Sequence, residues 1–293
     1  MKNTLIRLGL AVLWLLHWLP LSFIRVLGSG LGRLLYILAK SRRNIALTNL
    51  RLCFPQMDEE GRKVLAKRHI VVFAQAMLDR PLLWWATEER LRGIIRVNGA
   101  ENIDDGSGRP VILLIPHFVG LDACGLRISM DHRAADIYST QSNPVIDEVV
   151  YKGRSRFNNG ILISRQEGTR KAIQALRENI PLFYAADMDF GIRSSIFVPF
   201  FGVPAATVTG LPRLVEMTKA RVVPLVSHLT PDGYEAELQP AWENFPSGDL
   251  KADVRRLNAF VESQVLRMPE QYFWVHRRFK TRPPGEAGVY GRN

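Results

Sequence analysis

The sequence predicts an α/β fold in which helices cover both faces of a mainly parallel or mixed sheet, with a membrane-anchoring helix at the N-terminus. From residue 96 onward, short apolar runs alternate with amphipathic segments, a pattern typical of strand–helix units in a layered sheet. The first 57 residues are instead rich in Leu and Trp and contain no Asp or Glu. We therefore expect a membrane anchor or interfacial segment over residues 1–40 and one folded domain over residues 41–293.

The N-terminal segment has the composition of a membrane anchor. Residues 8–24 carry no formal charge, and their number is close to the lower limit for a spanning helix, about 17–25 residues. Pro20 is expected to break or kink this helix. A second apolar stretch, residues 26–39, is followed by Arg42 and Arg43, which suit a cytoplasmic flank. We expect one short anchor helix and then an interfacial segment; the alternative is two buried helices of a soluble core.

The net charge of +11 is concentrated in this N-terminal segment. Eight of the 39 Lys and Arg residues lie before residue 58, while the rest of the chain is nearly neutral. Cations interleaved with large apolar side chains favour an anionic membrane surface, whereas nucleic-acid-binding proteins place their charge on a folded polar face. Cys53 and Cys124 have no metal-binding or redox spacing, so we expect reduced thiols in a protein facing the cytosol.

The remaining elements follow from the apolar periodicity. Strands are expected at residues 111–115, 136–139, 161–164, 182–185, 222–227 and 234–238. Helices are expected at residues 59–83, 121–130, 144–157, 168–179, 210–220 and 250–268. In parallel sheets the active site lies beyond the carboxyl ends of the strands, where loops enter helices. That rule points to the segment after Ile115.

This segment contains His117, with Asp122 five residues later. On one continuous helix the two side chains would be about 140° apart, so they meet only if His117 lies in the loop and Asp122 in the first helical turn. Asp122 would then accept a hydrogen bond from one imidazole nitrogen and leave the other as a base. This is the His–Asp half of a triad without a serine nucleophile, and it suits direct attack by a substrate hydroxyl. The alternative is a core or capping histidine at a strand end.

Several ordered blocks of sequence carry a resemblance to a known family. They are Arg42-Arg43, residues 49–55, the block His117–Asp122, and residues 187–191, 197–202, 205–207 and 271–280. Together they resemble the lipid A biosynthesis acyltransferases, also called late acyltransferases, within the glycerolipid-acyltransferase-like superfamily. Many members have His-Phe-Gly-Asn-Trp-Glu where this chain has His-Phe-Val-Gly-Leu-Asp, so the acidic residue remains a carboxylate.

The resemblance implies an O-acyltransferase on the cytoplasmic face of a bacterial inner membrane. It implies an acyl carrier protein thioester as donor, a phosphorylated glucosamine disaccharide lipid as acceptor, and no cofactor. His117 would deprotonate the acceptor hydroxyl, and Asp122 would orient His117. An oxyanion-stabilising group is also needed, and backbone amides near Gly120 are one candidate.

Four further residues are expected to bind substrate. Arg165 and Arg170 follow a predicted strand and match basic positions of the family, and their forked donors suit a phosphate. The alternative for Arg170 is a solvated helix start. Asp187 and Asp189 follow the strand predicted at 182–185, where they could also have a structural or arginine-pairing role. Paired carboxylates can bind a metal, but no other ligand cluster accompanies them, so no metal is expected.

Other functions stay open. The nearest is the same chemistry on another acceptor, such as a lysophospholipid or an amino-acid-derived lipid. Another is a non-catalytic membrane-binding homologue, which predicts a blocked pocket or a separated His117 and Asp122. A serine hydrolase is excluded because the sequence has no Gly-x-Ser-x-Gly elbow. The aromatic run at residues 197–201 would line an acyl pocket or belong to the core.

Overall fold

The computed structural model describes residues 2–164 and 168–291 and contains a seven-stranded sheet in the order β1-β9-β8-β2-β5-β3-β4. The strands of this sheet are β1 (Ile95–Asn98), β2 (Val111–Leu114), β3 (Ala135–Tyr138), β4 (Ile161–Ser164), β5 (Leu182–Tyr184), β8 (Arg221–Thr230) and β9 (Gly233–Leu238). The five strands from β8 to β4 are parallel, while β9 runs antiparallel to β8. The predicted α/β class, with a mainly parallel or mixed sheet, is confirmed.

The helices cover this sheet on both faces. They are α1 (Lys2–Leu16), α2 (Leu21–Leu38), α3 (Lys40–Cys53), α4 (Glu59–Trp85), α5 (Glu88–Ile94), α6 (Leu121–Ser129), α7 (Pro144–Arg154), α8 (Thr169–Arg177), α9 (Gly210–Thr218) and α10 (Leu250–Arg267). Side chains of β2 alternate between two cores: Ile112 and Leu114 pack with α8, α9 and α10, and Leu113 packs with α5 and α6. This alternation explains why the strand reads as a continuous apolar run.

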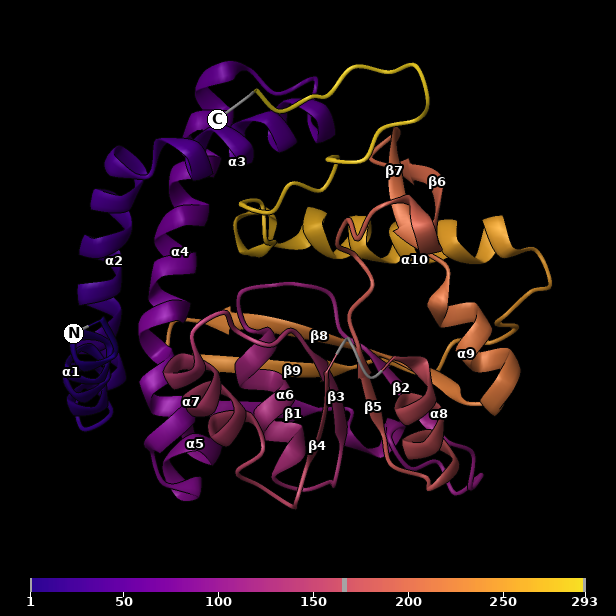
Figure 1. Cartoon of the computed structure of the whole chain (residues 1–293), viewed down its shortest axis with the longest axis horizontal. Coiled ribbons are helices and arrows are strands. Elements are labelled where there is room, and N and C mark those ends of the chain that lie inside the picture. The colour runs from indigo at the N-terminus through magenta and orange to yellow at the C-terminus, as the bar shows by residue number, and fades with distance from the viewer. Residues whose placement is uncertain (1, 165–167, 292–293) are drawn as a thin grey trace.

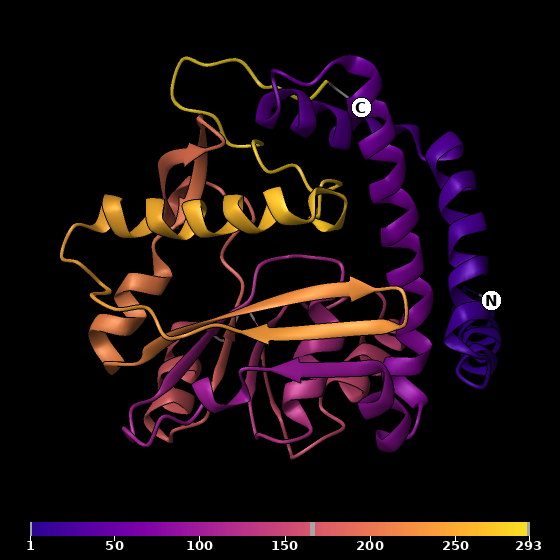
Figure 2. The same cartoon turned by 180° about the vertical axis from the view of Figure 1, so that it is seen from behind.

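A separate two-stranded hairpin consists of β6 (Ser195–Phe200) and β7 (Val203–Val208). It packs against α10, which Figures 1 and 2 show crossing above the main sheet. The aromatic run at residues 197–201 lies in this hairpin, where Phe200 is fully buried. Phe201 and Gly202 have positive φ angles of 49° and 78° and form the turn between the strands. The run is therefore part of the core and does not line the main cavity.

The N-terminal segment forms two helices that are separated at Pro20, as the sequence predicts. The break divides the uncharged stretch of residues 8–24 between α1 and α2. Among the residues that the structure describes, α2 is the one helix long and apolar enough to cross a membrane, by length and composition. Both helices leave large apolar side chains exposed, such as Leu8 and Val26.

Helix α2 lies alongside α4 at one side of the molecule (Figures 1 and 2). Its glycines allow the close approach: a Cβ atom at Gly28 would lie 2.7 Å from Gln75 Cα, and one at Gly32 would lie 2.5 Å from Val71 Cα. The glycine-rich run is thus a helix-packing face. Buried Arg25 also joins α2 to the sheet: it donates to Asp79 Oδ2 at 2.9 Å and to the backbone carbonyls of Thr230 and Gly233.

Candidate active site

The site lies at the carboxyl edge of the parallel strands. Strand β2 ends at Leu114, His117 follows in the loop, and α6 begins at Leu121. Strand β5 is the parallel neighbour of β2 and ends at Tyr184, so the loop that carries Asp187 leaves the sheet at the same edge. His117 was expected at such a strand-to-helix junction, and the structure places it there.

His117 and Asp187 form a two-point contact. His117 Nδ1 lies 2.6 Å from Asp187 Oδ1, and the backbone N–H of His117 donates to Asp187 Oδ2 at 3.0 Å. Burial acts to raise the pKa of Asp187, but His117 and its hydrogen bonds, together with Arg278, hold this pKa below its ordinary value. An ionised carboxylate only accepts hydrogen bonds, so Nδ1 carries the proton and Nε2 is left as the free base.

The predicted hydrogen bond between His117 and Asp122 is wrong, because His117 binds Asp187. Asp122, in the first turn of α6, instead accepts from Arg80 Nη2 at 2.7 Å and from Arg154 Nη2. Arg80 comes from α4 and Arg154 from the last turn of α7, two helices that the five-residue spacing could not reveal. Both His117 and Asp122 nevertheless line the same cavity. The two residues therefore belong to one site but have different hydrogen-bond partners.

Four charged residues make up this second group, which we call the charge cluster: Arg80, Asp122, Asp136 and Arg154. Arg154 bridges the two carboxylates, with Nη1 3.1 Å from Asp136 Oδ2. Burial acts to raise the pKa of Asp122, but Arg154 and Arg80 outweigh it and hold that pKa well below the ordinary value. Asp122 is therefore ionised at neutral pH. Burial, together with the neighbouring charge of Asp122, raises the pKa of Asp136 in spite of Arg154.

A cavity of about 1160 Å³ opens beside His117. Its volume exceeds that of most drug-sized ligand pockets, about 300–1,000 Å³, and so leaves room for an alkyl chain. All four residues of the charge cluster line it, together with apolar side chains such as Phe73, Leu121 and Phe190. The non-catalytic alternative predicts a blocked pocket or a separated His117 and Asp122. The pocket is open, while His117 and Asp122 do bind different partners.

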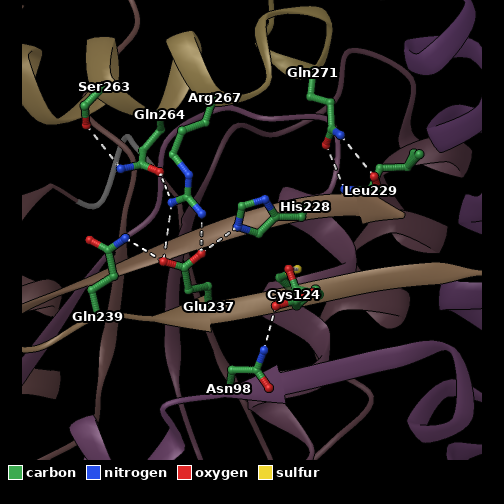
Figure 3. A network of polar contacts seen from close by, with 11 residues as sticks. Asn98, Cys124, His228, Leu229, Glu237, Gln239, Ser263, Gln264, Arg267 and Gln271 are labelled. Carbon is green, nitrogen blue, oxygen red and sulfur yellow. Dashed lines mark hydrogen bonds and ion pairs between the residues drawn. The ribbon is translucent and has the colours of Figure 1, made fainter. Parts of the chain in front are cut away.

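The C-terminal segment holds the loop that carries His117. Phe273 N–H donates to the carbonyl oxygen of His117 at 3.0 Å, and Val119 N–H donates to that of Gln271 at 2.9 Å. The Gln271 side chain in turn bonds both backbone groups of Leu229 on β8 (Figure 3). Figure 3 also shows Glu237 on β9 joined to Arg267 of α10. The loop is therefore tied to the sheet and to the segment after α10, which limits its movement.

The backbone amides expected to stabilise an oxyanion are largely occupied. The N–H groups of His117, Phe118, Val119 and Leu121 all donate to acceptors within the protein. In the charge cluster, by contrast, Arg80 Nε is buried without a hydrogen-bond partner among the described residues. Arg80 and Arg154 both line the cavity, so their guanidinium groups are candidates for binding negative charge there.

The other predicted substrate-binding residues have different outcomes. Asp189 is buried and accepts from Gly191 N–H and from the backbone and hydroxyl of Thr281, so its role is structural. Asp187 binds His117 and does not line the cavity. Arg170 is exposed in the first turn of α8 and does not line the cavity, although Thr169 and Ala172 of the same helix do. Arg165 lies outside the described residues.

Sequence reasoning missed Arg80, Asp136 and Arg154. One signal was available, because Asp136 is a carboxylate inside a predicted strand and such a residue needs a cationic partner. Within the described residues, no group of three or more His, Cys, Asp or Glu side chains could hold a metal ion.

Comparisons with known proteins identify the family. Residues 1–281 match the family described as bacterial lipid A biosynthesis acyltransferase. The lipid A biosynthesis lauroyltransferase of Escherichia coli (strain K12) is 35% identical over 97% of this chain and 94% of its own. The palmitoleoyltransferase of that pathway in the same organism is 31% identical over 96% and 93%, and the myristoyltransferase is 33% identical over 97% and 90%. The chain therefore belongs to the bacterial lipid A biosynthesis acyltransferase family.

Proposed function

We propose that this acyltransferase moves a fatty acyl chain from an acyl carrier protein thioester to a hydroxyl of a lipid A precursor, with His117 as general base. One observation carries the proposal: a histidine with Nδ1 held by Asp187 at 2.6 Å opens onto a cavity of about 1160 Å³ in a member of the lipid A acyltransferase family. The acceptor is supported by the family, and the donor by the sequence resemblance.

In the proposed reaction, Nε2 of His117 takes the proton from the acceptor hydroxyl, and the oxygen attacks the thioester carbonyl. The charge cluster stabilises the oxyanion through the guanidinium groups of Arg80 and Arg154. Collapse of the tetrahedral intermediate breaks the carbon–sulfur bond, and the carrier thiolate takes the proton from the His117 imidazolium. Asp187 keeps Nδ1 protonated throughout and stabilises the imidazolium that forms.

The phosphates of the acceptor need cationic partners near the cavity mouth. Arg193 lines the cavity, and Arg170 lies exposed at the start of α8 beside it. We assign these two arginines, with Arg165, to the acceptor phosphates because guanidinium forks match phosphate oxygens.

The exposed apolar side chains of α1 and α2 support attachment to a membrane, and the sequence resemblance supports the cytoplasmic face of the inner membrane. Removal of residues 1–40 would also delete Arg25 and leave Asp79 buried without its cation. A sharper test replaces exposed residues of α1 by serine, for example Leu5, Leu8 and Val12, and leaves α2 intact. The variant should move from the membrane fraction towards the soluble one; unchanged sedimentation in high salt and at alkaline pH would contradict attachment through this helix.

The function is tested with purified protein, a phosphorylated hydroxyacyl glucosamine disaccharide as acceptor, and either acyl carrier protein or coenzyme A as the thioester carrier. Mass spectrometry should show one added acyl chain, made faster from the carrier protein, and His117→Ala should lose about 10²–10⁴-fold of the rate. Acylation of a lysophospholipid in place of the disaccharide would overturn the acceptor assignment. Equal or faster turnover with the coenzyme A thioester would overturn the donor assignment.

A further inference from the structure

Helix α6 contains an interior glycine that the fold does not require. A Cβ atom added at Gly125 would meet nothing within 4 Å, whereas one at Gly153 would lie 2.2 Å from Trp84 Cδ1. Gly125 also has no positive φ angle that would demand glycine. Because glycine is the least favourable helix-interior residue after proline, neither packing nor backbone conformation explains its presence in α6.

Gly125 lines the cavity on the same stripe of α6 as Asp122 and Ser129, at spacings of three and four residues. From Asp122, which lies in the charge cluster, to Ser129 this stripe extends about 10 Å at 1.5 Å per residue. The surrounding wall consists largely of apolar side chains from α4, α6 and β5: Leu83, Trp84, Leu121, Leu126 and Phe183.

The residues of this wall are buried: Leu126 is 6% exposed, Phe183 7% and Ser129 8%, whereas the side chain of His117 is 24% exposed. An acceptor lipid keeps its other chains in the membrane and needs to bring only its hydroxyl group to His117. The donor chain, however, arrives from an aqueous carrier and must be withdrawn from water, so the buried apolar wall suits it better.

We propose that Gly125 is a specificity-determining residue: the space it leaves sets how far the donor acyl chain extends along α6, and hence which chain length is transferred. This inference rests on the proposed function. A larger side chain at position 125 would occupy that space and shorten the channel, and its Cβ atom would meet no neighbour within 4 Å. Each methylene of the donor chain that is no longer buried should lower kcat/KM for that chain roughly fourfold.

The test measures kcat/KM of the full-length enzyme for carrier-protein thioesters with saturated chains of ten to sixteen carbons and one fixed acceptor. Gly125→Leu should lower the ratio of long-chain to short-chain kcat/KM at least about tenfold, with short chains still transferred. Gly125→Ala adds one carbon and should shift the same ratio in the same direction by roughly fourfold or less, which keeps the test available if the leucine variant folds poorly.

Two control variants separate this effect from others. Gly93→Leu makes the same change on α5, where a Cβ atom also meets nothing within 4 Å but the position does not line the cavity, so the ratio should stay unchanged. Val208→Phe narrows the cavity from β7 instead. The inference is overturned if both Gly125 variants leave the ratio unchanged, or if only Val208→Phe shifts it. Failure of the unaltered enzyme to transfer any chain would instead overturn the proposed function and the inference with it.

Discussion

The His117–Asp187 pair and the charge cluster lie on one cavity but differ in what they can do. Asp187 is 2% exposed and holds a single titratable histidine, while Asp122 has a side chain 20% exposed and is held by two arginines. The first arrangement can move a proton, because the imidazole nitrogen that does not bind Asp187 can accept one from a substrate. In the second, Asp122 stays ionised, since Arg154 and Arg80 keep its pKa far below the ordinary value.

This difference teaches that spacing within one segment is a poor guide to hydrogen-bond partners. His117 and Asp122 are five residues apart, yet each binds a partner from elsewhere in the chain: Asp187 lies 70 residues from His117, and Arg154 lies 32 residues from Asp122. The sheet order decides the first pairing because it places β5 next to β2. The packing of α6 and α7 against α4 decides the second.

The largest effect is expected at Asp187. Asp187→Asn should lower kcat about 10³-fold with little change in KM, because an amide no longer fixes the His117 tautomer or stabilises the imidazolium. Steady-state kinetics in detergent measures both constants. Asp189→Asn is the matched control, since Asp189 is equally buried in the same loop but binds Thr281; it should lower the melting temperature and leave kcat within a few fold. Equal losses of kcat in the two variants would contradict the assigned roles.

A smaller loss is expected in the charge cluster. Arg154→Gln should lower kcat about 10²-fold, the size typical for removal of one oxyanion-stabilising donor. Arg156→Gln is its control, because Arg156 donates to the backbone carbonyls of Leu83 and Ala86 and does not line the cavity. A raised KM with unchanged kcat in Arg154→Gln would show that Arg154 binds substrate and does not stabilise the transition state.

The smallest effect concerns acid stability. Burial lowers the pKa of His69 to about 4, and burial together with the charges of His117 and Arg278 lowers that of His276 to about 4. The unfolded chain therefore takes up protons between about pH 6.5 and 4 that the native protein does not, and the free energy of unfolding falls as the pH falls through this window. At pH 5 each histidine should cost about 1–2 kcal/mol relative to pH 7.5.

Urea unfolding at the two pH values measures this difference. His69→Gln should remove part of the pH dependence while leaving the His117 site intact. A free energy of unfolding that is constant between pH 7.5 and 5 would contradict the neutral state of both buried histidines.

The sequence predicts most of the sheet because its strands are buried on both faces and read as apolar runs, as at Ile112 and Leu113. It also places His117 at a strand end. It could not pair His117 with Asp187, because that contact depends on the strand order, which no local pattern encodes. The β6–β7 hairpin was missed because its turn, Phe201-Gly202, lacks the Asn-Gly or Asp-Gly signal of a two-residue turn.

The N-terminal helices show a second limit of local patterns. Composition alone identifies an apolar, basic segment, and the break at Pro20 could be predicted from its missing N–H. The contact of Gly28 and Gly32 with α4 could not, since it depends on Gln75 and Val71, which lie 47 and 39 residues further along the chain. From the sequence alone, Arg25 would likewise be taken for a surface cation. Only the structure shows that it pairs with the buried Asp79.

The most direct test of the His117–Asp187 pair is NMR of protein labelled with ¹⁵N in histidine, with the His117 signals assigned by their loss in His117→Gln. The Nδ1-bound proton of His117 should be present in the unaltered protein, kept in Asp122→Asn, and lost or strongly shifted in Asp187→Asn. Loss of this signal in Asp122→Asn, with its retention in Asp187→Asn, would contradict the pairing and return Asp122 to the orienting role.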